Sequence, residues 1–278
     1  MNRINFLKKK SIELRIDILN MIYEAKSGHT GGSLSCTDIL TVIYYGVMNI
    51  DPKNPFWEDR DRFILSKGHS VEAYYAVLAD RGFFPKEELK TYCKYKSRLI
   101  GHPNVKVPGV EMNTGALGHG LSAGVGMALA AKMDKKSFKV YVLMGDGEQA
   151  EGSVWEAAMA AGHYKLDNLI GIIDRNKLQI SGCTEDVMTL ENLSDRWRSF
   201  GWEVIEVDGH DIQQLMDTFK KIPVAAQKPH LILAHTTKGK GVSFMENVAK
   251  WHHGVPDEEQ LNKAISELQT QLKEVAQE

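Results

Sequence analysis

An acidic residue held between two glycines follows a run of apolar residues near the middle of the sequence. In VYVLMGDGEQAEG this residue is Asp146, with Gly145 and Gly147 beside it, and a second apolar run in LIGIIDRNKLQ leads to Asn176. Carboxylate and carboxamide oxygens are hard ligands of the kind that Mg²⁺ or Ca²⁺ takes, and such a cation leaves positions open for phosphate oxygens and water. Flanking glycines let the backbone approach a ligand closely. The pattern predicts a metal-bound diphosphate.

The elements that carry these two residues are expected to bring them together. The apolar runs at 139–144 and 169–174 are predicted to be buried strands, with a helix at 153–164 between them. Such a unit places two parallel strands side by side, and ligands of an open parallel sheet bind beyond the carboxyl ends of its strands. A Gly-Asp-Gly sequence alone is usually only a turn. The metal prediction therefore depends on Asn176 at the matching strand end.

Helices and strands alternate along the rest of the chain. Ser35 or Thr37 is expected to cap the second helix, because KSGHTGGSLS interrupts helical periodicity. The alternation predicts an α/β fold with a parallel sheet and helices on both faces. Residues 1–278 are predicted to form a single domain that ends in a solvent-facing helix at about 257–277. The other predicted helices are 11–25, 38–48, 70–81, 86–95, one from about Gly120, and 211–222, and the other strands are 63–66, 202–207 and 230–236.

Composition and charge exclude several classes of function. The sequence is 43% hydrophobic and 25% charged, which is typical of a globular protein, and its net charge of −2 gives no electrostatic reason for a nucleic-acid or membrane partner. The well-separated Cys36, Cys93 and Cys183 lack metal-binding spacing and indicate reduced thiols. The N-terminus does not read as a signal peptide, and no apolar stretch is long enough to span a membrane. We expect a cytoplasmic protein.

Four segments, in the same order, resemble the N-terminal part of transketolase. Gly-Asp-Gly followed by a later asparagine is the diphosphate-binding motif that thiamine-diphosphate enzymes share. The likeness extends from about residue 10 to about 256, and its most specific segments are KSGHTGGSLS, DRFILSKGHS, GHPNVKVPGVEMNTGALGHGLSAGVGMALA and GDGEQAEGSVWEAA. The resemblance implies a thiamine-diphosphate-binding fold, thiamine diphosphate as cofactor, and Mg²⁺ with Ca²⁺ or Mn²⁺ as substitutes.

The resemblance also assigns roles around the cofactor. By match, Asp146, Asn176 and the backbone carbonyl of Leu178 bind the metal, and the N–H of Gly147 donates to the diphosphate. The remaining cofactor contacts that the resemblance implies are Gly115, Leu117 and His69, together with Glu151, which matches a glutamate thought to link the two cofactor sites of a dimer.

Several histidines match the histidines of the family's active site. His29, His69 and His102 follow this pattern, and in KWHHGVP the His-Gly pair favours His253, with His252 left open. The chemistry that the resemblance implies moves protons on and off sugar hydroxyls near neutral pH, for which histidine is well suited, while the cofactor is the electron sink. The remaining histidines singled out as structural are His163, His210, His230 and His235.

The sequence also departs from the family pattern. Thr30 stands where proline is common and His119 where glutamine is common. Transketolases continue with a domain that binds the aminopyrimidine ring and with a C-terminal domain. We therefore expect activity only with a second, pyrimidine-binding C-terminal subunit, in a two-plus-two heterotetramer acting on sugar phosphates. Trp155 and Met159 are expected either to contact that subunit or to pack in their helix.

Three alternatives remain open from the sequence. The α subunit of a 2-oxo acid dehydrogenase also binds the diphosphate in a separate chain, but the KSGH, SKGH and GHP histidines favour transketolase. A dinucleotide-binding Rossmann protein requires Gly-x-Gly-x-x-Gly directly after a strand, which GVGMALA does not offer. A non-catalytic relative is the third. The sugars stay open between the pentose phosphates and specialised sugar catabolism.

Overall fold

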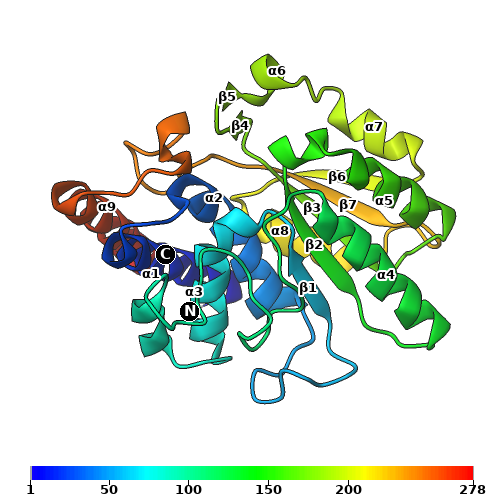
Figure 1. The fold of residues 1–278 in the computed structure, drawn as a ribbon, viewed down its shortest axis with the longest axis horizontal. Coiled ribbons are helices and arrows are strands. Elements are labelled where there is room, and N and C mark those ends of the chain that lie inside the picture. The colour runs from blue at the N-terminus through cyan, green and yellow to red at the C-terminus, as the bar shows by residue number, and fades with distance from the viewer. Residues whose placement is uncertain (1, 278) are drawn as a thin grey trace.

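A parallel sheet forms the centre of the molecule in the computed structural model, which describes residues 2–277 (Figure 1). The order of its five strands is β1-β2-β3-β7-β6, and all neighbours are parallel. Gly145 of β2 pairs with Asp174 of β3, so these two strands end side by side. The predicted parallel sheet is confirmed. The strands are β1 Arg62–Leu65, β2 Val140–Gly145, β3 Leu169–Arg175, β6 Glu203–Asp208 and β7 His230–His235.

Helices cover both faces of the sheet, as predicted. Tyr141 and Leu143 of β2 pack into the core on one face, and Val142 and Met144 pack into the core on the other, because successive side chains of a strand point in opposite directions. Burial on both faces explains why the strands read as unbroken apolar runs. The first face carries α1 Arg3–Ala25, α2 Thr30–Val42, α3 Val71–Arg81 and α8 Ile212–Lys221, and the second carries α4 His119–Met133, α5 Gly152–His163 and α7 Leu193–Ser199.

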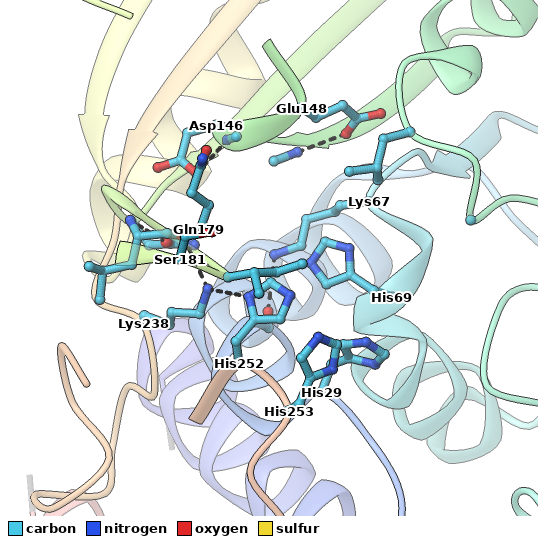
Figure 2. A pocket seen from close by; sticks show the side chains of 18 residues that line it. His29, Lys67, His69, Asp146, Glu148, Gln179, Ser181, Lys238, His252 and His253 are labelled. Carbon is cyan, nitrogen blue, oxygen red and sulfur yellow. Dashed lines mark hydrogen bonds between the residues drawn. The ribbon is translucent and has the colours of Figure 1, made fainter. Parts of the chain in front are cut away.

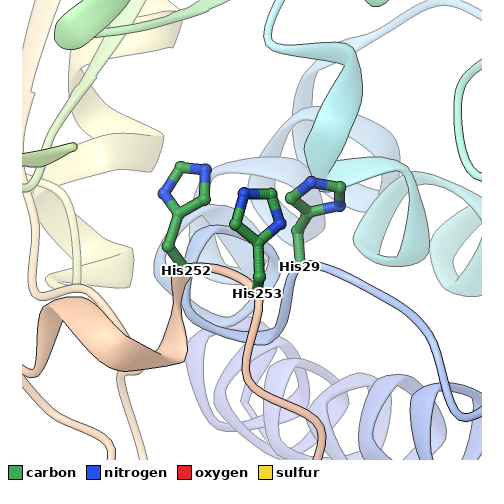
Figure 3. A group of neighbouring side chains, drawn as sticks. All are labelled: His29, His252 and His253. Atoms are coloured by element: carbon green, nitrogen blue, oxygen red, sulfur yellow. The ribbon is translucent and has the colours of Figure 1, made fainter. Parts of the chain in front are cut away.

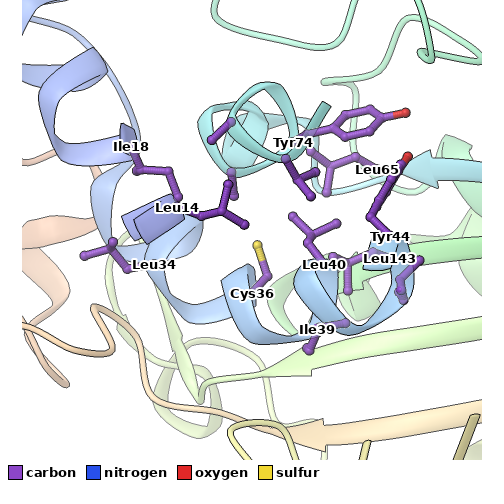
Figure 4. Close-up of a cluster of buried hydrophobic side chains, with 14 of the residues drawn as sticks. Leu14, Ile18, Leu34, Cys36, Ile39, Leu40, Tyr44, Leu65, Tyr74 and Leu143 are labelled. Carbon is purple, nitrogen blue, oxygen red and sulfur yellow. The ribbon is translucent and has the colours of Figure 1, made fainter. Parts of the chain in front are cut away.

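The larger core lies between α1, α2, α3 and the sheet (Figure 4). Leu14 of α1, Leu40 of α2 and Tyr74 of α3 are buried there together with Leu143. The Cys36 thiol lies among these side chains, and burial raises its pKa to about 12, so it stays protonated and inert. All three cysteines are free, as predicted.

The start of α2 differs from the prediction. The helix begins at Thr30, not near 38, and continues into a π-helical turn at Ile43–Val47. The glycines interrupt the apolar periodicity without interrupting the helix, because they serve close packing. A Cβ on Gly32 would lie 2.7 Å from Ser70 Oγ, and one on Gly31 would lie 3.0 Å from the Lys238 side chain. The predicted capping residues Ser35 and Thr37 are therefore inside the helix.

Two further helix boundaries differ from those predicted. Helix α1 begins at Arg3, because the Asn2 side chain accepts a hydrogen bond from the Asn5 N–H at 2.8 Å and caps it. The helix expected at 86–95 is only a 3₁₀ helix, Lys86–Thr91. It is followed by Cys93, whose φ of 54° is left-handed and incompatible with a continuing right-handed helix.

The last helix is less exposed than predicted. Helix α9, Glu258–Gln277, buries Leu261, Ala264 and Leu268 in the core that it shares with α1, so only its outer face meets solvent (Figure 1). Its register of three and four residues is that of an amphipathic helix. Within residues 2–277, every helix is too short or too polar to cross a lipid bilayer.

Candidate active site

A cavity of about 380 Å³ opens where β2 and β3 end (Figure 2). It is lined by many of the residues that the sequence singled out and by several that it did not. The predicted residues on its wall are His29, His69, Gly115, Leu117, Asp146, Gly147, Asn176, Leu178, His252 and His253. The others are Gly32, Lys67, Gly145, Glu148, Gln179, Ile180, Ser181 and Lys238.

The carboxylate of Asp146 is held firmly at the end of β2. Its side chain is 3% exposed, Oδ1 accepts from the Gly147 N–H at 2.8 Å, and Oδ2 accepts from the Lys177 N–H at 2.6 Å and from Arg175 Nη1 at 3.3 Å. Burial, with the nearby Asp174 charge, raises its pKa above the ordinary value. The Gly147 N–H predicted to bind diphosphate thus pairs with Asp146 here.

Three oxygen donors of the predicted metal set share this wall. Asn176 Oδ1 accepts only a local hydrogen bond, from the Leu178 N–H at 3.1 Å, and the Leu178 carbonyl accepts from the Lys238 ammonium at 3.1 Å. With the Asp146 carboxylate, this gives one charged and two neutral oxygen ligands. Such a set fits Mg²⁺, which completes its coordination with water and phosphate oxygens.

Two buried lysines give the cavity positive charge. Lys67 is 1% exposed and forms an ion pair with Asp174. Lys238 is 2% exposed, and its Nζ contacts the Leu178 carbonyl and His252 Nδ1, with no carboxylate within ion-pair distance in residues 2–277. Burial, followed by repulsion from Lys67, lowers the pKa of Lys238 to about 8. A buried cation without an anion is costly, so this wall is suited to a phosphate.

The sequence contained signals for both lysines that were not used. Lys67 lies in the quoted SKGH segment, two residues before His69. Lys238 follows β7 in HLILAHTTKGKG, and β7 pairs in parallel with β3. Because parallel strands end at one edge of a sheet, polar residues after β7 were candidates for the same site as Asp146.

Four histidine rings gather beside the lysines (Figure 2). The ring of His29 lies 4.5 Å from that of His253 and 5.4 Å from that of His69, measured between centroids, and His69 stacks on His252 at 5.2 Å. The two candidates in KWHHGVP therefore both reach the cavity. His252 is 8% exposed and bonded to Lys238, whereas His253 is exposed to solvent.

Two predicted site residues lie outside the cavity lining. The His102 ring is 6.2 Å from that of His29 and stands behind Gly115, where a Cβ would come within 2.6 Å of it. Glu151 is exposed at the start of α5, next to Gly118. An exposed position suits the interface role that the resemblance implies for Glu151.

The two departures from the family pattern have different surroundings. Thr30 Oγ1 donates to the Gly254 carbonyl at 2.6 Å and so ties the start of α2 to the segment that carries His253, a contact that proline cannot make. His119 is exposed at the start of α4, outside the residues that line the cavity.

Helix α3 fixes the loops that carry the histidines. The fully buried Glu72 carboxylate accepts hydrogen bonds from the His29 N–H at 2.9 Å, Ser33 Oγ at 2.7 Å and Tyr92 Oη at 2.7 Å. Tyr75, on the same helix, donates to the His102 carbonyl at 2.9 Å. These bonds hold two histidine loops against α3, which itself follows His69. Sequence reasoning did not identify Glu72.

Burial keeps two of these histidines neutral and makes stability depend on pH. Burial and the neighbouring His253 lower the pKa of His29 to about 4, and burial and Lys238 lower that of His252 to about 3. Between pH 6.5 and about 4 the unfolded chain binds more protons, so the free energy of unfolding should fall as the pH falls, by at most about 1.4 kcal/mol per pH unit for each ring.

Urea denaturation at a series of pH values measures this slope. His252→Asn should flatten it, whereas His163→Asn, at an exposed position, should leave it unchanged. A stability that rises on acidification through this window, or an equal slope in His252→Asn, would contradict the neutral state of the buried ring.

Comparison with known proteins places the whole chain in one group. Residues 8–273 match the family described as "Transketolase, thiamine diphosphate binding domain". One of the two subunits of the apulose-4-phosphate transketolase of Phocaeicola vulgatus is 53% identical over 99% of this chain and 98% of its own length. A 6-deoxy-6-sulfo-D-fructose transketolase subunit of a Clostridium species is 46% identical over 87% of this chain and 88% of its own length.

Longer transketolases match over part of their length. Mouse transketolase is 39% identical over 97% of this chain and 43% of its own length. The crystal structure of Campylobacter jejuni transketolase superposes with a TM-score of 0.90 and 34% identity, over 99% of this chain and 46% of that one. The present chain thus spans less than half of these proteins.

Proposed function

Because this chain belongs to the transketolase family, we propose that it is the diphosphate-binding subunit of a two-chain transketolase. Together with a partner chain it transfers a two-carbon ketol unit from a ketose phosphate to an aldose, with thiamine diphosphate and Mg²⁺. The observation that carries the proposal is one cavity where Asp146 and Asn176 meet the buried Lys238 at the ends of parallel strands.

The residues of this chain divide the work between binding and proton transfer. Asp146, Asn176 and the Leu178 carbonyl would hold the cation, and Lys238 faces the diphosphate as a buried positive charge. The cofactor, when bound, supplies the carbanion and the electron sink. A neutral His29 can accept a proton from a substrate hydroxyl and return it, because burial keeps its pKa below neutral pH.

A second chain would complete the site. The relatives of nearly equal length are named as transketolase subunits, and the chains that combine all parts are more than twice as long. Exposed apolar side chains on the outer helices offer contact area: Met133 of α4 is 74% exposed and Met159 of α5 58%. Trp155 instead packs on Trp197, with ring centroids 5.5 Å apart. The proposed assembly is a two-plus-two heterotetramer, and the free cysteines suit a reducing cytoplasm.

Reconstitution with the pyrimidine-binding partner tests the proposal. Neither chain alone should transfer a ketol unit, whereas the mixture should do so from xylulose 5-phosphate or from another ketose phosphate in a panel that includes apulose 4-phosphate and 6-deoxy-6-sulfofructose phosphate. Turnover should require both thiamine diphosphate and Mg²⁺. Ketol transfer by this chain alone would contradict the proposal, and so would a complex that decarboxylates pyruvate and leaves every ketose phosphate unchanged.

A substitution of Glu72 should impair turnover without emptying the cofactor site. Glu72→Ala leaves three buried donors unpaired, among them the His29 N–H, and lets that loop move. We expect kcat to fall roughly 10- to 100-fold, because small displacements of a positioned group cost that much, with cofactor affinity changed far less. Steady-state kinetics and cofactor titration measure both quantities.

The exposed Glu87 offers a matched control, since Glu87→Ala removes the same side chain from the surface. Glu72→Gln, which keeps the shape and one oxygen acceptor, should recover part of the lost turnover. Equal kcat in Glu72→Ala and the unaltered protein would show that the His29 loop is held by other contacts.

A further inference from the structure

Three histidines form a compact cluster at the edge of the cavity (Figure 3). His29, His252 and His253 each offer one ligand nitrogen, and these nitrogens all lie within 4.8 Å of one another. The rings come from two segments far apart in the sequence. The hydrogen bond from Thr30 Oγ1 to the Gly254 carbonyl, at 2.6 Å, joins these segments directly beside the cluster. The arrangement is therefore fixed by the fold.

Imidazole nitrogen is a ligand for a different class of metal than the oxygen set at Asp146. Three histidines with an open fourth position are a well-known arrangement for Zn²⁺, and Co²⁺ accepts the same geometry, whereas Mg²⁺ prefers oxygen. We propose that His29, His252 and His253 bind a borderline transition-metal cation such as Zn²⁺, at a site separate from the proposed Mg²⁺ site.

The geometry requires a modest closure of the rings. Metal–nitrogen bonds of about 2.0–2.1 Å in a tetrahedron place ligand nitrogens about 3.3–3.4 Å apart, so nitrogens as far apart as 4.8 Å must approach by about 1.5 Å. His253 is exposed, and its side chain can rotate toward the other two.

The protonation state and hydrogen bonding of the rings also suit metal binding. A metal ligand must be neutral imidazole, and burial lowers the pKa of His29 to about 4 and that of His252 to about 3. His29 Nδ1 is buried without a hydrogen-bond partner in the described part of the chain. Lys238 Nζ contacts His252 Nδ1 at 2.8 Å, which orients that ring and leaves its Nε2 for a metal.

The charge of the nearby lysines limits the affinity. The ammonium of Lys238 and, further away, that of Lys67 repel a divalent cation and face the same cavity. We therefore expect a dissociation constant on the order of micromolar, weaker than that of a structural zinc site.

Cobalt absorption of the full chain tests the site without the cofactor. With excess Mg²⁺ present, addition of Co²⁺ should produce the intense visible absorption of a four-coordinate ion at one equivalent, and Zn²⁺ should displace it. His253→Asn, at an exposed position where folding is not at risk, and His252→Asn should each weaken Co²⁺ binding at least tenfold. His102→Asn is the matched control, because that ring lies near His29 but outside the cluster.

Three results would overturn the proposal. The first is a weak, six-coordinate cobalt spectrum for the unaltered chain. The second is Co²⁺ affinity in His253→Asn and His252→Asn equal to that of His102→Asn. The third is loss of the band in Asp146→Asn with the band retained in both cluster variants, which would place the ion at the oxygen set. None of these measurements depends on enzymatic activity, so the site can fail while the proposed function stands.

Discussion

Replacing Asp146 by alanine is expected to abolish the Mg²⁺-dependent binding of thiamine diphosphate to the complex of this chain with its partner. Asp146 is the one charged member of the proposed ligand set, since Asn176 and the Leu178 carbonyl contribute neutral oxygens. Loss of that charge should weaken cofactor affinity by more than about 100-fold at a fixed Mg²⁺ concentration. Calorimetric titration with thiamine diphosphate, repeated over a range of Mg²⁺ concentrations, measures the change.

The control must separate metal binding from folding. Alanine also leaves Arg175 and the Lys177 N–H without their carboxylate, so the melting temperature of Asp146→Ala should fall. Asp146→Asn keeps the shape and an oxygen acceptor, and it should retain most of the stability while still losing cofactor affinity. Asp195→Asn, at an exposed site, should match the unaltered protein. Cofactor affinity preserved in Asp146→Asn would refute the metal assignment.

Replacing His69 by alanine should lower turnover far more than stability. The ring lines the cavity and stacks on His252 at 5.2 Å, and burial with the Lys67 charge lowers its pKa well below the ordinary value. A group that transfers protons to and from reacting hydroxyls typically contributes 100- to 10,000-fold. We expect kcat to fall by about 100-fold or more.

Kinetics and thermal unfolding of the same preparations test this prediction. His69→Asn should be as slow as His69→Ala, because an amide donates a hydrogen bond but does not exchange a proton near neutral pH. His163→Ala, which changes an exposed histidine, should keep full turnover. A His69→Ala variant with full activity would remove this residue from the reaction.

The strands and the main ligand positions could be predicted because they leave simple patterns. The run 139–144 and β2, Val140–Gly145, differ by one residue, and Asp146 and Asn176 both line the cavity at adjacent strand ends. A strand that is buried on both faces must be continuously apolar, and a parallel sheet has one edge where all its strands end. These constraints act locally and can be read from a single sequence.

Features that depend on tertiary contacts could not be predicted in this way. The glycines at the start of α2 were read as a helix break, because their need for close packing against Ser70 and Lys238 is visible only in the fold. Glu72 pairs with the His29 loop across more than forty positions of sequence. The pairing of Lys238 with His252, rather than with a carboxylate, likewise arises from the approach of two loops.

Crystallography of the two-chain complex with thiamine diphosphate and Mg²⁺ tests the central claim most directly. The proposal predicts one metal ion bound by an Asp146 carboxylate oxygen, Asn176 Oδ1 and the Leu178 carbonyl, with the diphosphate completing its coordination and Lys238 facing the phosphates. A structure in which the cofactor is bound while Asp146 and Asn176 point away from its metal would contradict the proposal.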